Sequence, residues 1–302
     1  MLTRRTLIAA PLAATLVRAV DAQEPATGGM QLAMHQNTSR AAGFRRSLEG
    51  WAQAGIRQVE LTDVLLDEFL QNDTLQGARR LLADLNLTPV SAAAVLPDVW
   101  ITGPARAASL ETWRRRCEQF VALGLDQIYC PSITTRPVTA ADFAATPGCI
   151  REVGDITRGF GLTAMIEFAR TSTHLATLPS TLQVIREAGH AAVRPMLDFF
   201  HFYSGLSKLE DLDLLEPGEL AHVHFQDLLR GPRELIDNNS RLIPGDGIAP
   251  VVPMLRKLAA KRYRGALSVE LFRAELVQGD PFEVAEDIRA KCEAVMRSAQ
   301  VL

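Results

Sequence analysis

The sequence predicts one α/β domain, a (β/α)8 TIM barrel, on the basis of two patterns and the chain length. From residue 30 to the end, eight short apolar runs alternate with amphipathic segments of helical period. The apolar runs are nearly continuous, which is typical of parallel strands buried on both faces. The region after residue 29 also suits the ~250 residues of such a barrel with one or two long loops. We therefore expect a single barrel over residues 30–302.

The first 22 residues have the pattern of a twin-arginine signal peptide. The pair Arg4-Arg5 precedes an apolar segment over residues 7–17, and the cleavage pattern "VDA" ends at Ala22. This apolar segment is shorter than the ~20 residues that a membrane-spanning helix needs. We expect cleavage near Gln23, a short tail over residues 23–29, and a periplasmic or secreted protein that is not anchored in a membrane.

Composition and charge exclude several classes of protein. Of the 302 residues, 47% are hydrophobic and 22% are charged, as in a soluble globular protein. Removal of residues 1–22 takes away three arginines and one aspartate, so the formal charge falls from −3 to −5. A mildly acidic protein is poorly suited to bind nucleic acid. The four cysteines show neither zinc-site spacing nor a disulfide framework, and the sequence does not pair them.

Each predicted strand is a run of four to eight residues rich in β-branched, aromatic and other apolar residues. In chain order the predicted strands are 30–36, 57–62, 88–95, 127–132, 162–168, 194–200, 220–226 and 266–272. An open, doubly wound sheet is the alternative, but the segment "MHQNTSRAAG" after the first strand lacks the glycine-rich phosphate turn of that fold.

The predicted helices lie between the strands and show apolar residues at helical spacing. They are 44–55, 110–124, 149–161, 180–189 and 251–263. Several of them end at a glycine, the residue most suited to the left-handed position that closes a helix.

Polar residues of ligand type interrupt the last four strands near their carboxyl ends, where a barrel places its active site. They are Glu167, Asp198 with His201 just beyond it, His222 and His224, and Glu270. Each one alone is more often a helix cap or a hydrogen-bonded core histidine. Several carboxylates at one barrel mouth repel each other, however, and need a cation. Carboxylates with an imidazole suit Mn²⁺, Mg²⁺ or Co²⁺, with Zn²⁺ an alternative.

The order and spacing of these residues resemble the sugar phosphate isomerase/epimerase superfamily, also called xylose isomerase-like barrels. The resemblance rests on "AMIEF", "LDFFHFYSG", "HVHFQD", "RLIPGDG" and "SVELF", and it extends over nearly the whole chain after the signal peptide. It implies one divalent ion, Mn²⁺ before the others, bound by Glu167, Asp198, His224 and Glu270. It also implies that His201 and Arg241 bind substrate oxygens, and that Glu167 and Glu270 are the acid/base pair.

The resemblance implies an isomerase or epimerase that acts on a sugar, keto-sugar or related polyol. The proton beside a carbonyl would be removed to give an enediolate. A lyase or dehydratase acting on a keto-sugar, keto-glycoside or cyclic polyol begins with the same step and stays open. A three-metal nuclease is disfavoured, because the chain has no histidine between His35 and His174. A non-catalytic sugar-binding barrel is disfavoured because all four ligands and Arg241 are present.

Two further residues are candidates for substrate contact. His35 ends the first predicted strand, where it either touches substrate or lies on the surface. Trp100 lies in the loop "LPDVWITGP" and either stacks on a sugar face or fills the barrel mouth. The expected partner is a small carbohydrate-like molecule, and a homo-oligomer stays open.

Overall fold

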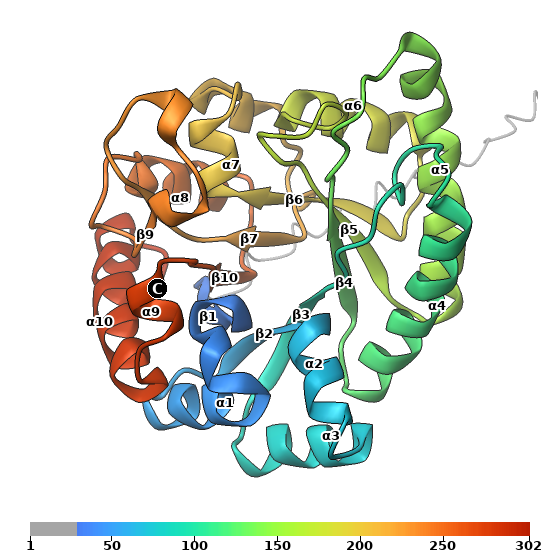
Figure 1. Cartoon of the computed structure of the whole chain (residues 1–302). Coiled ribbons are helices and arrows are strands. Elements are labelled where there is room, and N and C mark those ends of the chain that lie inside the picture. Colours follow the sequence, from blue (N-terminus) through green and yellow to red (C-terminus); the bar gives the residue numbers. More distant parts are fainter. Residues whose placement is uncertain (1–28) are drawn as a thin grey trace, which may run out of the picture.

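The computed structural model describes residues 29–302 (Figure 1). The predicted signal peptide and residues 23–28 of the predicted tail lie outside the described residues, so export stays a prediction. Among the helices of the described residues, none is both long enough and apolar enough to cross a membrane.

Eight parallel strands close into a barrel, in the order β1-β10-β7-β6-β5-β4-β3-β2 (Figure 1). The barrel strands are β1 Gln31–His35, β2 Gln58–Thr62, β3 Thr88–Ala93, β4 Gln127–Pro131, β5 Thr163–Glu167, β6 Val193–Asp198, β7 His222–His224 and β10 Ala266–Val269. All eight predicted strands and the predicted barrel are confirmed. A separate antiparallel hairpin, β8 Asp227–Leu228 with β9 Arg241–Leu242, lies between β7 and β10 in the chain.

Helices surround the barrel and cover its outer face (Figure 1). They are α1 Gly43–Gln53, α2 Asp63–Leu70, α3 Leu75–Asp84, α4 Arg106–Ala122, α5 Ala140–Gly159, α6 Leu178–Ala188, α7 Phe199–Ser204, α8 Val251–Ala260, α9 Ala274–Val277 and α10 Pro281–Ala299. Four short 3-10 helices are η1 Gln36–Ala42, η2 Leu209–Leu214, η3 Arg233–Leu235 and η4 Asn238–Ser240.

The five predicted helices are present, but the one expected over residues 149–161 begins much earlier. Helix α5 starts at Ala140, where Thr139 and Asp142 form a reciprocal capping box, and Pro147 lies inside the helix. The sequence prediction placed the start of this helix two residues after Pro147, although proline is unusual inside a helix. Here the cap determines where the helix starts.

The main hydrophobic core lies between the outer face of the barrel and the helices. Large side chains such as Trp51, Trp113 and Phe120 are fully buried in it. Helix α10 closes the fold on the first strand, because the Met30 amide donates to the Val301 carbonyl at 2.6 Å. The two ends of the described chain therefore lie together at the amino-terminal face of the barrel, opposite the mouth.

The inside of the barrel has an apolar side and a polar side. Ala93, Tyr129, Met165 and Met196, from β3 to β6, form a small buried cluster of their own. Because side chains alternate along a strand, Met165 and Met196 lie on the same face as the residues two positions later. The inward face of β5 and β6 therefore continues toward the mouth as Glu167 and Asp198.

The loop after β5 is attached to α5 by His174, which is 3% exposed. Its Nε2 lies 2.8 Å from Thr146 Oγ1. Burial lowers the pKa of His174 to about 4. The folded protein therefore holds this imidazole neutral, while the unfolded chain binds a proton at an ordinary pKa.

We predict that acidification destabilises the protein partly through His174. Because the pKa is lower in the folded state, this contribution is complete above pH ~6.5 and is lost as the pH falls toward ~4. The free energy of unfolding should fall by roughly 1–3 kcal/mol more in the native protein than in His174→Gln over this range. Urea unfolding at several pH values tests this, since the other titrating groups are common to both proteins. Parallel pH profiles would contradict the prediction.

Candidate metal and substrate site

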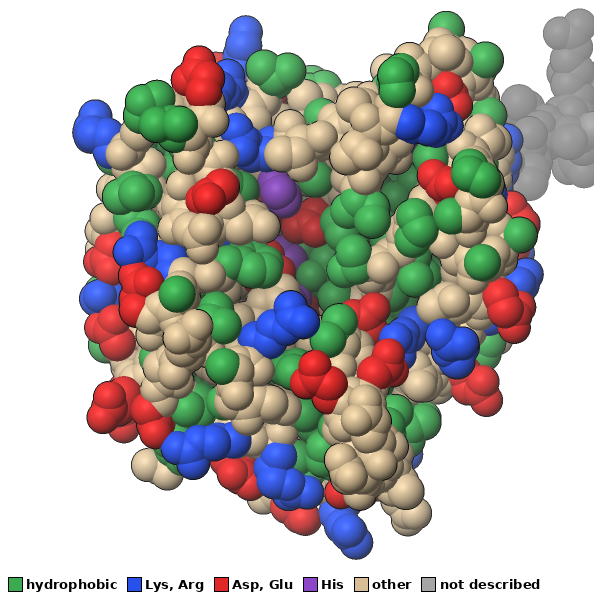
Figure 2. All heavy atoms as spheres, viewed as in Figure 1, with side chains coloured by type: hydrophobic (Ala, Val, Ile, Leu, Met, Phe, Trp, Pro, Cys, Tyr) green, Lys and Arg blue, Asp and Glu red, His purple; other side chains and the backbone are tan. Residues whose placement is uncertain are grey.

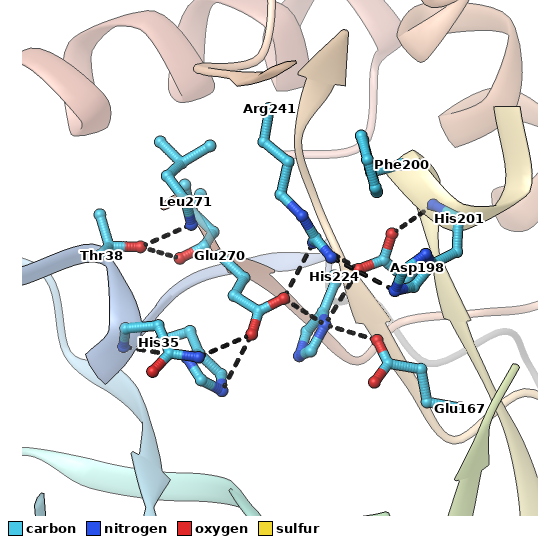
Figure 3. A network of polar contacts seen from close by, with 12 residues as sticks. His35, Thr38, Glu167, Asp198, Phe200, His201, His224, Arg241, Glu270 and Leu271 are labelled. Carbon is cyan, nitrogen blue, oxygen red and sulfur yellow. Dashed lines mark hydrogen bonds and ion pairs between the residues drawn. The ribbon is translucent and has the colours of Figure 1, made fainter. Parts of the chain in front are cut away.

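Four polar side chains meet at the carboxyl ends of four neighbouring barrel strands. Glu167 ends β5, Asp198 ends β6, His224 ends β7, and Glu270 directly follows β10. One oxygen or nitrogen atom from each lies within 4.8 Å of those from the other three. All four residues are buried. The predicted cluster is therefore present as a compact group (Figure 3).

His224 lies at the centre of this group. Its Nδ1 is 3.1 Å from Glu167 Oε1, 3.4 Å from Asp198 Oδ2 and 3.4 Å from Glu270 Oε2. Burial opposes a charge on His224, but the surrounding carboxylates outweigh it and hold its pKa well above the ordinary value. The imidazole therefore carries a positive charge among the carboxylates when no other cation is bound.

Arg241 supplies the second positive charge. Its Nη1 donates to Asp198 Oδ2 at 2.6 Å and to Glu270 Oε2 at 2.9 Å. Its guanidinium carbon also contacts two aromatic rings, 4.5 Å from the centroid of Phe200 and 5.0 Å from that of Phe272. Arg241 thus joins two of the carboxylates and packs against both rings.

The β8–β9 hairpin positions Arg241 at the start of β9. Its anchor is Asp227, whose buried carboxylate accepts hydrogen bonds from the backbone amides of Leu228, Gly245, Gly247 and Ala249. A Cβ atom at Gly247 would collide with the Asp227 carboxylate and the Leu228 carbonyl, so only glycine fits there. The sequence "RLIPGDG" therefore serves to hold the guanidinium over the cluster.

Asp198 has two roles that the sequence analysis treated as alternatives. Its Oδ1 accepts from the His201 backbone amide at 2.7 Å and caps α7, while its Oδ2 faces Arg241 and His224. Burial opposes ionisation of this carboxyl, but Arg241 and the hydrogen bond with His224 outweigh it and hold the pKa well below the ordinary value. The carboxylate is therefore ionised inside an apolar strand.

Hydrogen bonds to the residues before and after Glu270 fix its backbone. Thr38 Oγ1 donates to the Val269 carbonyl at 2.8 Å and accepts from the Leu271 amide at 3.0 Å (Figure 3). The Glu270 side chain accepts from Asn37 Nδ2 at 3.0 Å. The backbone on either side of this carboxylate therefore has little freedom.

The two glutamates differ in their protonation. Burial raises the pKa of Glu167 to about 7, although its hydrogen bond with His224 lowers it. Burial also acts on Glu270, but there His224 and Arg241 outweigh it, and the pKa lies below the ordinary value. Near neutral pH and without a bound cation, Glu270 is ionised and Glu167 is partly protonated. Two carboxyl groups whose surroundings separate their pKa values suit an acid/base pair.

Glu60 is a member of the network that the sequence analysis missed. It is fully buried, and its Oε2 lies 3.0 Å from His222 Nε2 and 3.1 Å from His224 Nε2. The pairing of β2 with β3 is irregular at Val59/Glu60, beside Pro89, and such an irregularity can redirect a side chain. A carboxylate within "RQVELT" is the same signal as the one in "AMIEF", but it lies in the middle of the strand rather than at its end.

The four residues that were predicted to contact substrate separate into two groups. His201 and Arg241 line the cavity at the barrel mouth. Burial lowers the pKa of His201 to about 4, so its ring is neutral, and its Nε2 accepts from Arg241 Nη2 at 3.3 Å. His35 and Trp100 do not line this cavity.

The structure places His35 and Trp100 outside the lining of the cavity. His35 is fully buried rather than on the surface, and its Nε2 lies 2.9 Å from the Tyr129 hydroxyl and 3.7 Å from Glu270 Oε1. Trp100 is 2% exposed, and its Nε1 donates to the Cys130 carbonyl at 2.9 Å. His35 therefore lies beside Glu270, while Trp100 packs in the main core against Trp113 of α4.

The cavity above the cluster has a volume of about 590 Å³. Figure 2 shows it as a hollow in the barrel mouth, with histidine and acidic side chains at its base. Glu167, Glu270, Asn37 and Arg170 are among its lining residues. A small molecule in this cavity would reach the carboxylates directly.

The donor set fits a divalent metal ion. Three carboxylates and one imidazole nitrogen match the ligand preferences of Mn²⁺, Mg²⁺, Co²⁺ and Zn²⁺. Because Glu60 accepts from Nε2 of His224, the other ring nitrogen, Nδ1, is turned toward the three carboxylates. A carboxylate behind a histidine ligand is a common support of protein metal sites.

A family model described as the xylose isomerase-like TIM barrel matches residues 48–296. The chain belongs to this family. The matched region includes β2 to β10 and all four members of the cluster.

Curated relatives of this xylose isomerase-like barrel include inosose isomerases. The inosose isomerase of Halalkalibacterium halodurans is 23% identical over 257 residues, which cover 82% of this chain and 90% of the relative. That of Bacillus licheniformis is 22% identical over 251 residues, which cover 82% of this chain and 90% of the relative.

Solved structures share the fold. The crystal structure of the IolI protein with a bound zinc atom has a TM-score of 0.83 and 19% identity, and the match covers 89% of this chain and 99% of that one. A D-allulose 3-epimerase from Methylomonas sp. in complex with D-allulose has a TM-score of 0.71 and 20% identity, over 88% and 97% of the two chains. At these identities the likeness shows the fold.

We predict that Glu60→Gln weakens the binding of Mn²⁺ by about 10- to 100-fold, because His224 loses its charged acceptor. Calorimetric titration of the metal-stripped protein measures this affinity, and circular dichroism checks that the variant is folded. Glu118→Gln is the matched control, since it removes the same charge from an exposed position in α4. Equal affinities in the native protein and Glu60→Gln would show that Glu60 does not support the site.

Proposed function

We propose that this protein is a divalent-metal-dependent isomerase or epimerase of a sugar, keto-sugar or related polyol. The observation that carries the proposal is the convergence of Glu167, Asp198, His224 and Glu270 within 4.8 Å. This cluster lies at the base of a cavity large enough for a sugar. The inosose isomerases and sugar epimerases among the similar proteins support the same class of reaction.

In this proposal the four converging side chains hold one divalent ion, with Mn²⁺ the first candidate and Mg²⁺, Co²⁺ or Zn²⁺ the others. The zinc atom in the IolI structure supports a divalent ion in a barrel of this fold. A bound ion would polarise the substrate carbonyl and stabilise negative charge on its oxygen.

The chain's own residues would move the proton. Glu167 and Glu270 would form the acid/base pair: one takes the proton from the carbon beside the carbonyl, and the other returns one. Arg241, which lines the cavity, could donate to the oxygen that becomes negative. His201 and Asn37 line the same cavity and would orient the hydroxyl groups of the substrate.

A lyase begins with removal of the same proton, and analysis of the product separates the two reactions. Elimination expels a hydroxyl or alkoxyl group, whereas epimerisation returns the proton to the same carbon. Export, if residues 1–22 direct it, favours unphosphorylated sugars as substrates.

The first prediction from this proposal concerns the metal. The native protein should bind one divalent ion per chain, and Asp198→Ala should bind almost none, because a central ligand is lost. At a metal concentration about 100 times the dissociation constant, the native protein should gain ~2.7 kcal/mol of stability, and the variant should not. Elemental analysis and thermal unfolding measure both effects. Asp213→Ala, in η2 and outside the cluster, is the control. Two or more ions per chain, or one ion retained in Asp198→Ala, would contradict the site.

The second prediction concerns proton transfer. Turnover of a keto-sugar in D₂O should place deuterium on the carbon beside the carbonyl, which NMR detects. Glu167→Gln should retain much of the metal affinity, because an amide oxygen can still coordinate, but should lose turnover by ~10²-fold or more. Conversion without solvent exchange would indicate a hydride shift instead. Normal turnover in Glu167→Gln would remove this residue from the acid/base role.

A further inference from the structure

The cavity at the barrel mouth has two unlike walls. Glu167, Glu270 and Arg241 form the polar wall, on the side of β5, β9 and β10, where Phe200 and Phe272 also line the cavity. On the side of β2, β3 and β4, each strand is followed by one aliphatic residue that lines the cavity. These are Val64, Val95 and Ile133, which are 42%, 50% and 41% exposed. We call these three residues the aliphatic wall. In Figure 2, hydrophobic side chains gather on one side of the hollow, beside the histidine and acidic groups.

The aliphatic wall is held in place by buried polar groups. The Asp63 carboxylate accepts from the backbone amide of Val64 at 2.9 Å and from that of Val95 at 3.4 Å, so it joins the loops after β2 and β3. The residues on either side of Ile133 are also bonded, Ser132 through its amide to the Glu167 carbonyl and Thr134 through its carbonyl to the Thr173 amide, both at 2.8 Å. Hydrogen bonds to the backbone at or beside Val64, Val95 and Ile133 therefore fix the positions of the three residues.

The apolar surface continues from the aliphatic wall down to the cluster. Ala93 and Tyr129, which are paired in β3 and β4, line the cavity, as does Pro131. An elongated molecule could therefore place its polar end on Glu167 and Glu270 and its apolar end on the aliphatic wall. A free sugar has only small C–H faces between its hydroxyl groups and would cover less of this wall.

The volume of the cavity agrees with such a molecule. At about 590 Å³ it falls in the range of pockets that hold drug-sized ligands, roughly 300–1,000 Å³. We propose that the substrate is a glycoside, in which the reacting keto-sugar carries a ring-sized apolar aglycone that packs on Val64, Val95 and Ile133. The identity of the sugar as the reacting part rests on the proposed function, whereas the packing of the aglycone rests on the aliphatic wall.

Binding of unreactive glycosides tests the aglycone site without turnover. Phenyl and methyl β-D-glucopyranoside lack a ketone and differ only in the aglycone. The Mn²⁺-loaded protein should bind the phenyl glucoside about 10-fold or more tightly than the methyl glucoside, because the ring buries apolar surface on the wall. NMR titration measures both dissociation constants. Equal affinities, or no binding of either compound at its solubility limit, would overturn the proposal.

Substitution of the wall tests where the ring binds. The triple variant Val64→Thr/Val95→Thr/Ile133→Thr nearly conserves shape at partly exposed positions, and it should reduce the phenyl preference to less than about threefold. Leu214→Thr is the control, since Leu214 is 47% exposed but does not line the cavity. It should keep the full preference. If the triple variant still preferred the phenyl glucoside over the methyl glucoside by about 10-fold, the phenyl ring would bind somewhere other than the aliphatic wall.

The outcomes also separate this proposal from the proposed function. A phenyl preference that depends on the wall, without deuterium exchange in any keto-sugar or keto-glycoside, would support the aglycone site and refute the chemistry. Deuterium exchange in a free keto-sugar without a phenyl preference would support the chemistry and refute the aglycone site.

Discussion

Three carboxylates that face one another at the closed end of a cavity need positive charge close by, and much of the surrounding structure supplies it. Arg241 joins Asp198 to Glu270, and His224 contacts all three. Both cations are themselves buried, so they also need fixed partners. Glu60 accepts a hydrogen bond from Nε2 of His224, and the β8–β9 hairpin positions Arg241. Residues in the interior of β2 and in the β8–β9 hairpin therefore take part in balancing the charge of the three carboxylates.

This balance also explains why the two glutamates are not equivalent. Arg241 contacts Glu270 but makes no hydrogen bond to Glu167, which depends on His224 alone. One carboxyl is therefore firmly ionised, while the other has a pKa of about 7. An asymmetry of this kind is what a reaction with one proton donor and one proton acceptor requires.

The sequence allowed prediction of the barrel and of the cluster because both leave periodic or local signals. Alternating apolar runs indicate strands, and carboxylates at strand ends interrupt those runs visibly. The start of α5 was missed because a proline concealed a helix that a capping box begins earlier. Glu60 was missed because a mid-strand carboxylate has no local partner, and its histidines lie more than 160 residues away in the chain. The position of Trp100 could not be predicted because it depends on how its loop packs, and loop packing leaves no periodic pattern in the sequence.

The junction between Met30 and Val301 has a practical consequence for handling the protein. Because it lies at the barrel face opposite the mouth, a tag or surface linker added at residue 302 would start away from the cavity. The neighbouring positions of residues 29 and 302 also allow both ends to be joined by a short peptide. New termini could then be opened in an outer loop, and the cluster would keep its surrounding strands.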